Sequence, residues 1–375
     1  MKRIAIVITL TALAVALLPC SASAEEDLQR LLYVSSRDGA GGRGEKGIYV
    51  YDIDNDHKLV KFIPLPQIGG TRGATACAAT GRFYISYDHR LMCFDLKTEE
   101  VVWEKKFTEE EGGCDRIGIT PDGKKLYVPD GWWNGSPNVK VLDANSGDLL
   151  KKIKITEHGG LHNLIVSLDG KRVYSGSTQY DMLSVIDTET DTVVKRVGPI
   201  IGVIQPFTIN GSQTLAYINS HLYRREGYGV GFEIGDLRTG KILHIVNVPG
   251  LENEVGRCHG IGLTPDEKEV WLADQNRQQL HVFDNTTLPP KFKQTLKVAM
   301  KSHGWICFSR DGRFAWPDTG EVFDVKTKQI VAHLTQQPNG KGDPVASSKF
   351  IEIHWRGDDV VWAGRQMGVG YAGQE

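Results

Sequence analysis

Residues 120–128, Thr-Pro-Asp-Gly-Lys-Lys-Leu-Tyr-Val, combine a tight Asp-Gly turn with a short strand that carries an aromatic residue. Close copies lie at residues 168–174, 265–271 and 310–316, and weaker copies end at Tyr84 and Tyr217. The Asp side chain caps such a turn, Gly allows its positive φ, and the β-branched and aromatic residues that follow favour a strand. The pattern predicts a strand–turn–strand unit that repeats along the chain.

A second landmark falls between these turns: an apolar or small residue followed by an aspartate that closes a strand. These aspartates are Asp52, Asp95, Asp143, Asp187, Asp236, Asp284 and Asp324. They are 40 to 49 residues apart, a period typical of four-stranded propeller blades. No segment keeps the apolar spacing of an amphipathic helix. We therefore predict an all-β fold, a seven-bladed β-propeller with four antiparallel strands per blade.

Both ends of the chain contain strand patterns outside the complete repeats. Near the N-terminus they cover residues 31–35, 47–53 and 59–65, and near the C-terminus residues 350–355. Closing a ring of blades removes most exposed strand edges. We expect N- and C-terminal strands to share one blade and close the ring, while a further strand pattern at residues 360–364 leaves its strand count open.

The first 24 residues have the pattern of a cleaved signal peptide. Lys2 and Arg3 precede an uncharged apolar run over residues 4–18, and Ala22-Ser23-Ala24 supplies the small residues of a cleavage site. We expect residues 25–375 to form the exported protein. No later run approaches the roughly 20 residues that span a bilayer. A lipoprotein start at Cys20 is the alternative, which Pro19 disfavours.

The repeats carry a family resemblance. Residues 120–128 and 183–194, the latter Leu-Ser-Val-Ile-Asp-Thr-Glu-Thr-Asp-Thr-Val-Val, resemble repeats of the exported YVTN- or YncE-type propellers, and the similarity covers nearly all of residues 25–375. More narrowly, the chain resembles the β subunits of hydrazine synthases. That resemblance implies a subunit without its own haem, which assists partner haems that make hydrazine from nitric oxide and ammonium. It also implies the periplasm or an equivalent compartment, such as the anammoxosome lumen.

Charge and cysteine content narrow the function classes. Lys and Arg number 44 against 46 Asp and Glu, so the chain lacks the excess positive charge of a nucleic-acid-binding protein. There is no CxxCH motif, so we expect no covalently bound haem on this chain. Five cysteines remain after cleavage, an odd number at wide spacings, and we expect them to be buried: Cys77, Cys93, Cys114, Cys258 and Cys307.

The inner strand of each blade should begin near the propeller axis. Counting twelve residues back from each aromatic landmark gives mostly polar residues, namely Arg72, Asp115, His162, Gln205, His259 and Gly304, with Arg116 and His303 adjacent. His162, His259 and His303 could bind a divalent metal such as zinc, copper or manganese, with Gln205 or Asp115 as a further ligand. Alternatively, these groups hydrate a water-filled channel.

The loops between second and third strands should open on the same face as these axial residues. Several carry side chains that often dominate binding interfaces, and we predict partner or ligand contacts for Trp132, Trp133, Tyr180, His221, Tyr223, Arg224, Arg225 and Arg277. The alternative is that the tryptophans cap blade edges.

Two functions follow from these features. The favoured one is a haem-free interaction subunit of an exported oxidoreductase complex, whose partners carry the haem. The other is a stand-alone metal-dependent lyase or hydrolase that acts on a polar or acidic substrate guided by Arg72, Arg116 and Arg224. The sequence contains no serine-nucleophile elbow and no HExxH motif.

Overall fold

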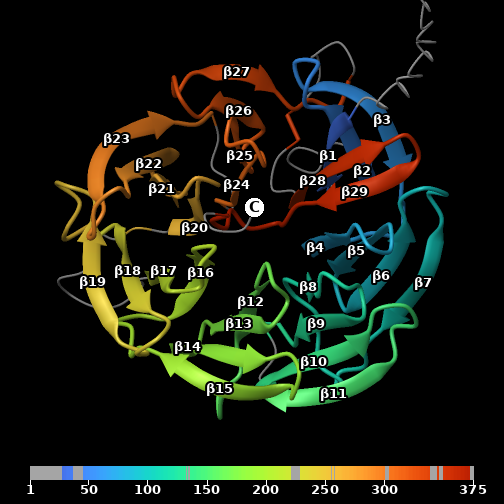
Figure 1. Ribbon diagram of the computed structural model, residues 1–375, viewed down its shortest axis with the longest axis horizontal. Coiled ribbons are helices and arrows are strands. Elements are labelled where there is room, and N and C mark those ends of the chain that lie inside the picture. Colours follow the sequence, from blue (N-terminus) through green and yellow to red (C-terminus); the bar gives the residue numbers. More distant parts are fainter. Residues whose placement is uncertain are drawn as a thin grey trace, which may run out of the picture.

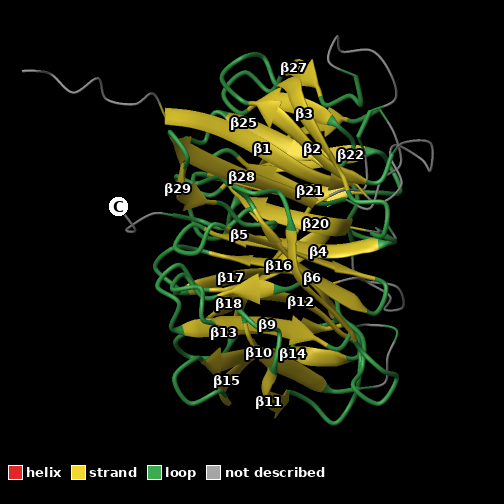
Figure 2. Ribbon diagram, turned by 90° about the vertical axis from the view of Figure 1, so that its right-hand side faces the viewer, coloured by secondary structure: helices red, strands yellow, loops and turns green. Residues whose placement is uncertain are grey.

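The computed structural model describes residues 28–36, 45–131, 133, 136–220, 229–254, 256, 258–299, 304–337, 344–345 and 349–371. These residues form 29 strands in seven antiparallel sheets, which are arranged as blades around one axis (Figure 1). Seen from the side, the described part of the chain consists of strands and loops (Figure 2). The predicted all-β, seven-bladed propeller is confirmed. Within these ranges no helix is long and apolar enough to cross a membrane.

Six blades follow one another in chain order, each with four strands. Blades 1 to 3 contain β4 (Thr71–Cys77), β5 (Arg82–Tyr87), β6 (Arg90–Asp95) and β7 (Val101–Lys106); β8 (Gly118–Ile119), β9 (Lys125–Pro129), β10 (Asn138–Asp143) and β11 (Leu149–Lys154); and β12 (Leu161–Val166), β13 (Arg172–Ser177), β14 (Tyr180–Asp187) and β15 (Thr192–Val197). Blades 4 to 6 contain β16 (Ile204–Ile209), β17 (Leu215–Ser220), β18 (Gly231–Asp236) and β19 (Ile242–Asn247); β20 (Cys258–Leu263), β21 (Glu269–Asp274), β22 (Gln279–Asp284) and β23 (Lys291–Lys297); and β24 (Ile306–Phe308), β25 (Phe314–Pro317), β26 (Glu321–Asp324) and β27 (Ile330–His333).

The closing blade combines the two ends of the chain, as predicted. It contains β1 (Leu28–Ser36), β2 (Gly47–Asp52), β3 (Lys58–Pro64), β28 (Lys349–Arg356) and β29 (Asp359–Ala363), in the order β29-β28-β1-β2-β3. β1 and β28 pair from Leu28 opposite Arg356 to Ser35 opposite Lys349. The strand count left open for this blade is five, because a tight turn at Gly357, with a φ of 56°, returns the chain beside β28.

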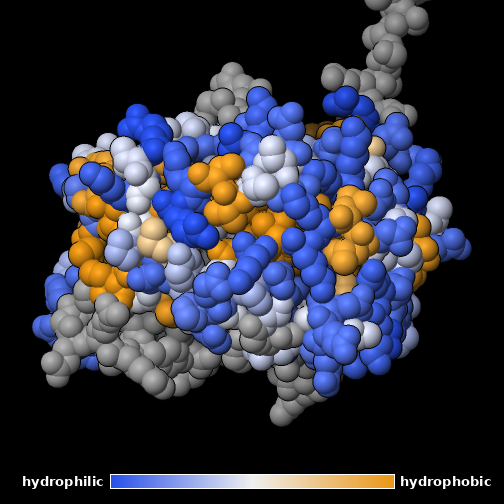
Figure 3. All heavy atoms as spheres, turned by 90° about the horizontal axis from the view of Figure 1, so that it is seen from below, coloured by the Kyte–Doolittle hydropathy of each residue, from blue (hydrophilic) through white to orange (hydrophobic). Residues whose placement is uncertain are grey.

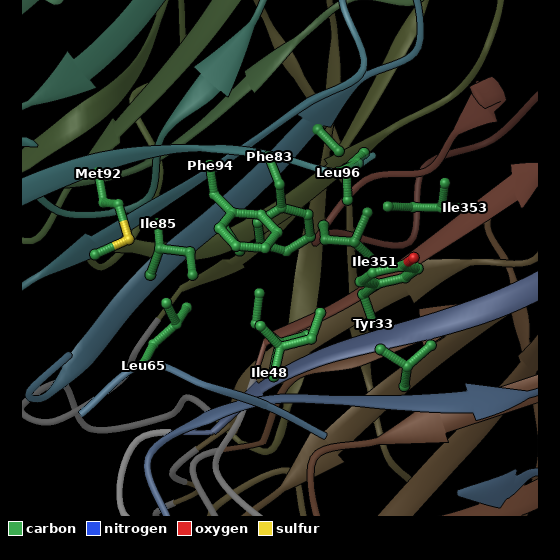
Figure 4. Packing of buried hydrophobic residues seen from close by; sticks show 14 of the residues in the cluster. Tyr33, Ile48, Leu65, Phe83, Ile85, Met92, Phe94, Leu96, Ile351 and Ile353 are labelled. Carbon is green, nitrogen blue, oxygen red and sulfur yellow. The ribbon is translucent and has the colours of Figure 1, made fainter. Parts of the chain in front are cut away.

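A hydrophobic core fills the space between the closing blade and blade 1. Figure 4 shows side chains from both blades in contact there, including Tyr33, Ile48, Phe83, Phe94, Ile351 and Ile353. All six are at least 96% buried. Because the residues come from both ends of the chain and from the first complete blade, this core stabilises the ring at its point of closure.

Both repeated aspartates act as caps of turns. Asp143, which ends the third strand of blade 2, accepts hydrogen bonds at Oδ1 from the backbone N–H groups of Asn145 (2.8 Å) and Ser146 (3.0 Å). Asp122 accepts one from the Lys124 N–H (3.1 Å), and the following Gly123 has a φ of 70°. These landmark aspartates therefore stabilise local turns of the blade.

The repeated aromatic residue connects neighbouring blades. The Tyr127 hydroxyl of blade 2 donates to Asp191 Oδ1 of blade 3 at 2.5 Å, and the Tyr174 hydroxyl of blade 3 donates to Gln213 Oε1 of blade 4 at 3.0 Å. Equivalent bonds link Tyr84 to Ala144 O, Tyr217 to Asn285 Oδ1 and Trp316 Nε1 to His57 Nε2. A ring with a polar tip fits this position because it packs between the blades and bonds across the gap.

The outer strands form the rim of the disc. They expose one or two apolar side chains in most blades, for example Leu149 and Leu150 in β11 and Val194 in β15. Figure 3 shows part of this rim as apolar patches separated by polar side chains. Scattered exposed apolar residues are normal for a soluble protein, and we assign no site to the rim.

The C-terminal segment closes one end of the axis. After β29, residues 364–371 run to the centre of the ring (Figure 1). They hydrogen-bond to inner strands through Ala74 N to Gln366 Oε1 (2.8 Å), Leu263 N to Gly368 O (2.9 Å) and Gly370 N to Ile209 O (3.0 Å). Ile209 and Leu263 are the last residues of their strands. We call this side the plugged face, and the side where the inner strands begin the mouth face.

The bonds between blades generate a first prediction. Tyr127→Phe should lower the free energy of unfolding by about 2 kcal/mol, because the lost hydrogen bond has a charged acceptor. Tyr174→Phe is the matched control at the same repeat position, with a neutral acceptor, and should cost about 1 kcal/mol. Urea denaturation measures both. If neither substitution lowers stability, these bonds do not hold the blades together.

Candidate functional site

The mouth face brings together most of the predicted axial residues. Arg72 lies near the start of β4, Arg116 just before β8, His162 in β12, Gln205 in β16 and His259 in β20. Because the inner strands are adjacent around the axis, these positions converge although they are far apart in the sequence. His162, His259 and Arg116 are at most 4% exposed, whereas Arg72 and Gln205 are half-buried.

Asp115, Arg116 and His162 form one buried network. His162 Nδ1 lies 2.7 Å from Asp115 Oδ2 and 2.9 Å from Arg116 Nη1, and Arg116 Nη1 also contacts Asp115 Oδ1. Burial alone would raise the pKa of Asp115, but Arg116 and His162 outweigh it and hold that pKa below its ordinary value. Burial and the neighbouring Arg116 lower the pKa of His162 to about 4. At neutral pH the network therefore holds a carboxylate, a guanidinium and a neutral imidazole.

Trp305 lies at the centre of the cluster, and the sequence analysis missed it. The Arg116 Cζ lies 4.1 Å and the Lys349 Nζ 4.5 Å from the centroid of the indole ring, so two cations contact one aromatic side chain. The His259 ring meets the indole edge-on at 4.9 Å between centroids, and His162 lies 5.6 Å from His259. Trp305 follows Gly304, the residue that the twelve-residue count selected, by a single position.

Lys349 is the second residue that the sequence analysis missed. It is the first residue of β28 and is 4% exposed. Burial, and next the charge of Arg116, lower the pKa of Lys349 well below its ordinary value. Asp318 acts on it in the opposite direction and also accepts hydrogen bonds from the Gly304 N–H (3.0 and 3.1 Å). The sequence feature that could have revealed Lys349 is its position directly before the strand predicted at residues 350–355.

Arg72 connects the axis to a loop of blade 2. Its Cζ lies 4.4 Å from the Trp133 ring centroid, and His89 meets the same ring edge-on at 6.0 Å. A Cβ placed on Gly113 or Gly131 would come within 2.8 Å of this indole. Trp133 thus packs closely on the backbone of its own blade while it contacts an axial cation.

The remaining predicted contact residues are distributed around the mouth face or lie outside the described ranges. Tyr180 begins β14 and is half-buried. Arg277, between β21 and β22, pairs with Asp274 Oδ2 (2.9 Å) and Glu254 Oε2 (3.1 Å). The predictions that fall outside the described residues concern the signal peptide at 1–24, Cys20, Trp132, His221, Tyr223, Arg224, Arg225 and His303.

The described residues contain no group of three or more His, Cys, Asp or Glu side chains arranged to hold a metal. Among them, His162 Nε2 is buried and has no hydrogen-bond partner, while its Nδ1 is engaged by Asp115 and Arg116. Since His303 lies outside these ranges, the three-histidine site remains a prediction.

Burial suppresses the reactivity of several described cysteines. All five described cysteines are buried and unpaired with one another. Burial raises the pKa of Cys93 to about 11 and those of Cys114 and Cys307 to about 12. Because the thiolate is the nucleophilic form, these side chains are inert near neutral pH.

Two cavities lie toward the plugged face. One of about 30 Å³ lies under Arg116 and is bounded by Gln366 and Met367 of the C-terminal segment. The other, of about 250 Å³, is lined by residues that include Thr75, Trp362 and Arg365. The two guanidinium nitrogens of Arg365 donate to Val166 O and Ser167 O, so this arginine is already used in holding the segment.

The buried histidines predict how stability depends on pH. Burial lowers the pKa of His57 and of His162 to about 4, so the unfolded chain, with histidine pKa values near 6.5, binds protons more readily. Stability is therefore full above about pH 6.5 and should fall as the pH drops toward 4, by at most about 3 kcal/mol per histidine. His162→Gln should reduce this slope in urea denaturation, whereas His158→Gln, at an exposed site, should not. If the free energy of unfolding depends equally on pH in both variants, the lowered pKa of His162 does not cause the loss of stability at low pH.

Comparisons with known proteins place the fold. No family model matches the chain, and no curated protein matches its sequence. Among solved structures, the chain is similar to hydrazine synthase from Kuenenia stuttgartiensis, with a TM-score of 0.61 and 14% sequence identity over 79% of this chain and 93% of that one. At this identity the likeness concerns the fold: this chain is a propeller of the kind found in a hydrazine synthase structure.

Proposed function

We propose that this chain is an exported propeller subunit without haem of its own, which docks through its mouth face on a haem-bearing partner in an oxidoreductase complex. The observation that carries the proposal is the asymmetry of the axis. Residues 364–371 close one end with hydrogen bonds to the inner strands, and the buried charged and aromatic cluster lies toward the other. A partner therefore meets the polar groups of the axis from one face only.

The fold likeness to hydrazine synthase supports this role, because it extends over 93% of the matched chain. The missing CxxCH motif supports it too, since covalent c-type haem would then be carried by another chain. By this resemblance, nitric oxide and ammonium would combine on partner haems, and the propeller would position a loop beside them. The compartment would be the periplasm or its equivalent.

Several mouth-face residues have the side chains expected of a docking surface. Trp133, Tyr180 and Arg277 lie in or beside loops between second and third strands. In the sequence, residues 221–228 connect β17 to β18 and contain His221, Tyr223, Arg224 and Arg225. Tryptophan, tyrosine and arginine contribute most to binding where an interface excludes water.

Isolation of the complex tests the proposal. The tagged full-length chain should co-purify from its native cells with a partner containing covalent haem, quantified per propeller by the pyridine haemochrome spectrum. Trp133→Ala combined with Arg224→Ala and Arg225→Ala should lower the haem recovered at least tenfold, since such residues often contribute 2 kcal/mol or more each.

The control variant changes three lysines in exposed turns between first and second strands, Lys124→Ala, Lys171→Ala and Lys268→Ala. It should retain wild-type haem recovery. A wild-type chain that recovers no haem protein, or a control that loses as much haem as the mouth-face variant, would contradict the proposal.

A metal-dependent lyase or hydrolase is the second candidate, and the histidine pair is the observation that favours it. His162 and His259 lie 5.6 Å apart between ring centroids, and His162 Nε2 has no hydrogen-bond partner among the described residues. In this case near-stoichiometric zinc, copper or manganese should accompany the purified protein, and His259→Ala should release it. Elemental analysis of the same preparations separates the two candidates.

A further inference from the structure

The axial cluster has an imbalance of charge. Its described cations are Arg72, Arg116 and Lys349, and its described carboxylates are Asp115 and Asp318. The other four groups act electrostatically on Lys349. With Lys349 protonated, three positive and two negative side chains leave one positive charge in excess, because burial keeps His162 neutral at pH 7. Burial and the charge of Arg116 lower the pKa of Lys349 well below its ordinary value, so the protonated lysine needs a further anion beside it. The excess lies in a region where Asp115, Arg116 and Lys349 are each at most 4% exposed.

The carboxylates of the cluster are already engaged. Asp115 contacts both Arg116 and His162, and Asp318 accepts two contacts from the Gly304 N–H. Lys349 Nζ instead lies over the Trp305 ring, which Arg116 also contacts. An aromatic face offsets only part of the cost of burying a cation, and two like charges share this one ring.

Lys140 shows how the same fold satisfies a buried lysine. It is 1% exposed, pairs with Asp130 and donates to Gly113 O (2.7 Å) and Glu111 O (3.2 Å). All three partners are oxygens that match the three N–H donors of an ammonium group. Lys349 is buried to a similar degree, but within the described ranges it has no set of oxygen acceptors like that of Lys140. A buried ammonium group in that setting is stabilised by an anionic partner.

Other polar atoms of the cluster are also without partners. Within the described part of the chain, Arg72 Nε, Arg116 Nε and His162 Nε2 are shielded from solvent and make no hydrogen bond. Two of these atoms are guanidinium donors, which bind oxyanions most strongly. Because residues 364–371 close the other end of the axis, a ligand would enter from the mouth face.

We propose that the axial cluster binds a carboxylate group beside Trp305, held by Arg72, Arg116 and Lys349. A single carboxylate balances the charge of the cluster with Lys349 protonated, whereas a phosphate with nearly two charges would leave a negative excess. The carboxylate comes either from a small free acid or from an acidic side chain of a docking partner. The site does not require that the partner carry haem, so it stands or falls separately from the proposed function.

Thermal unfolding of the full chain tests the site, with sodium acetate replacing sodium chloride at constant ionic strength and pH 7. Acetate should raise the Tm of the wild type, and the rise should follow the logarithmic concentration dependence of a bound ligand. Lys349→Met should itself unfold at a higher temperature than the wild type, because the cost of burying the lysine is gone, and should bind acetate at least tenfold more weakly.

Two further variants keep the test decisive. Lys140→Met removes a buried lysine that is fully paired, and should lower the Tm while leaving the acetate affinity within twofold of wild type. Arg72→Gln, at the half-buried edge of the cluster, should weaken acetate at least fivefold in isothermal titration even if Lys349→Met fails to fold. No acetate effect on the wild type, or a Lys349→Met variant that unfolds earlier and binds acetate normally, would overturn the proposal.

Acetate added to the co-purified complex decides whether the carboxylate comes from a partner or from a free acid. If a partner's acidic side chain occupies the site, saturating acetate should release the co-purified partner. If the site takes a free acid, the partner should remain bound and acetate should still bind to the complex. Either result supports the carboxylate site, whereas a complex that neither releases its partner nor binds acetate contradicts it.

Discussion

The pairing of β1 with β28 is the contact on which the rest of the structure depends. It joins residues 28–35 to residues 349–356 and so connects the two ends of the chain. Once the ring is closed, seven inner strands must begin around one axis, and side chains from distant parts of the sequence are brought within contact distance. Lys349 is the clearest case, because it lies on the closing strand itself and contacts Trp305 of blade 6, which Arg116 of blade 2 also contacts.

Much of the fold could be predicted because each blade repeats the same local interactions. Asp143 and Asp122 cap turns within a few residues of their own positions, so their spacing is visible in the sequence. The aromatic landmark forms a hydrogen bond to the next blade, as Tyr127 does, but it too recurs at a regular position in the repeat. The fifth strand of the closing blade belongs to no repeat. Its strand pattern is visible at residues 360–364, but the hairpin at Gly357 that places it beside β28 is not.

The axial cluster could be predicted only in part, for two physical reasons. Arg72, Asp115, His162 and His259 follow the blade register, so counting from an aromatic landmark located them. Trp305 lies one residue beyond the counted position, and Lys349 belongs to a blade whose inner strand comes from the other end of the chain. Two basic side chains on one buried ring depart from the rule that buried charged groups are paired with opposite charges. Such departures are expected at binding sites, whereas Lys140 with Asp130 shows the rule being followed.

Hydrogen–deuterium exchange of the free chain and of the chain in its co-purified complex tests the central claim most directly, namely that binding occurs through the mouth face. The account predicts slower exchange in the complex for peptides spanning residues 126–133 and 175–181, at the ends of second strands on the mouth face. It predicts no change at residues 120–125 and 167–172, in turns between first and second strands. Protection confined to those turns, or to the outer strands of the rim, would contradict it.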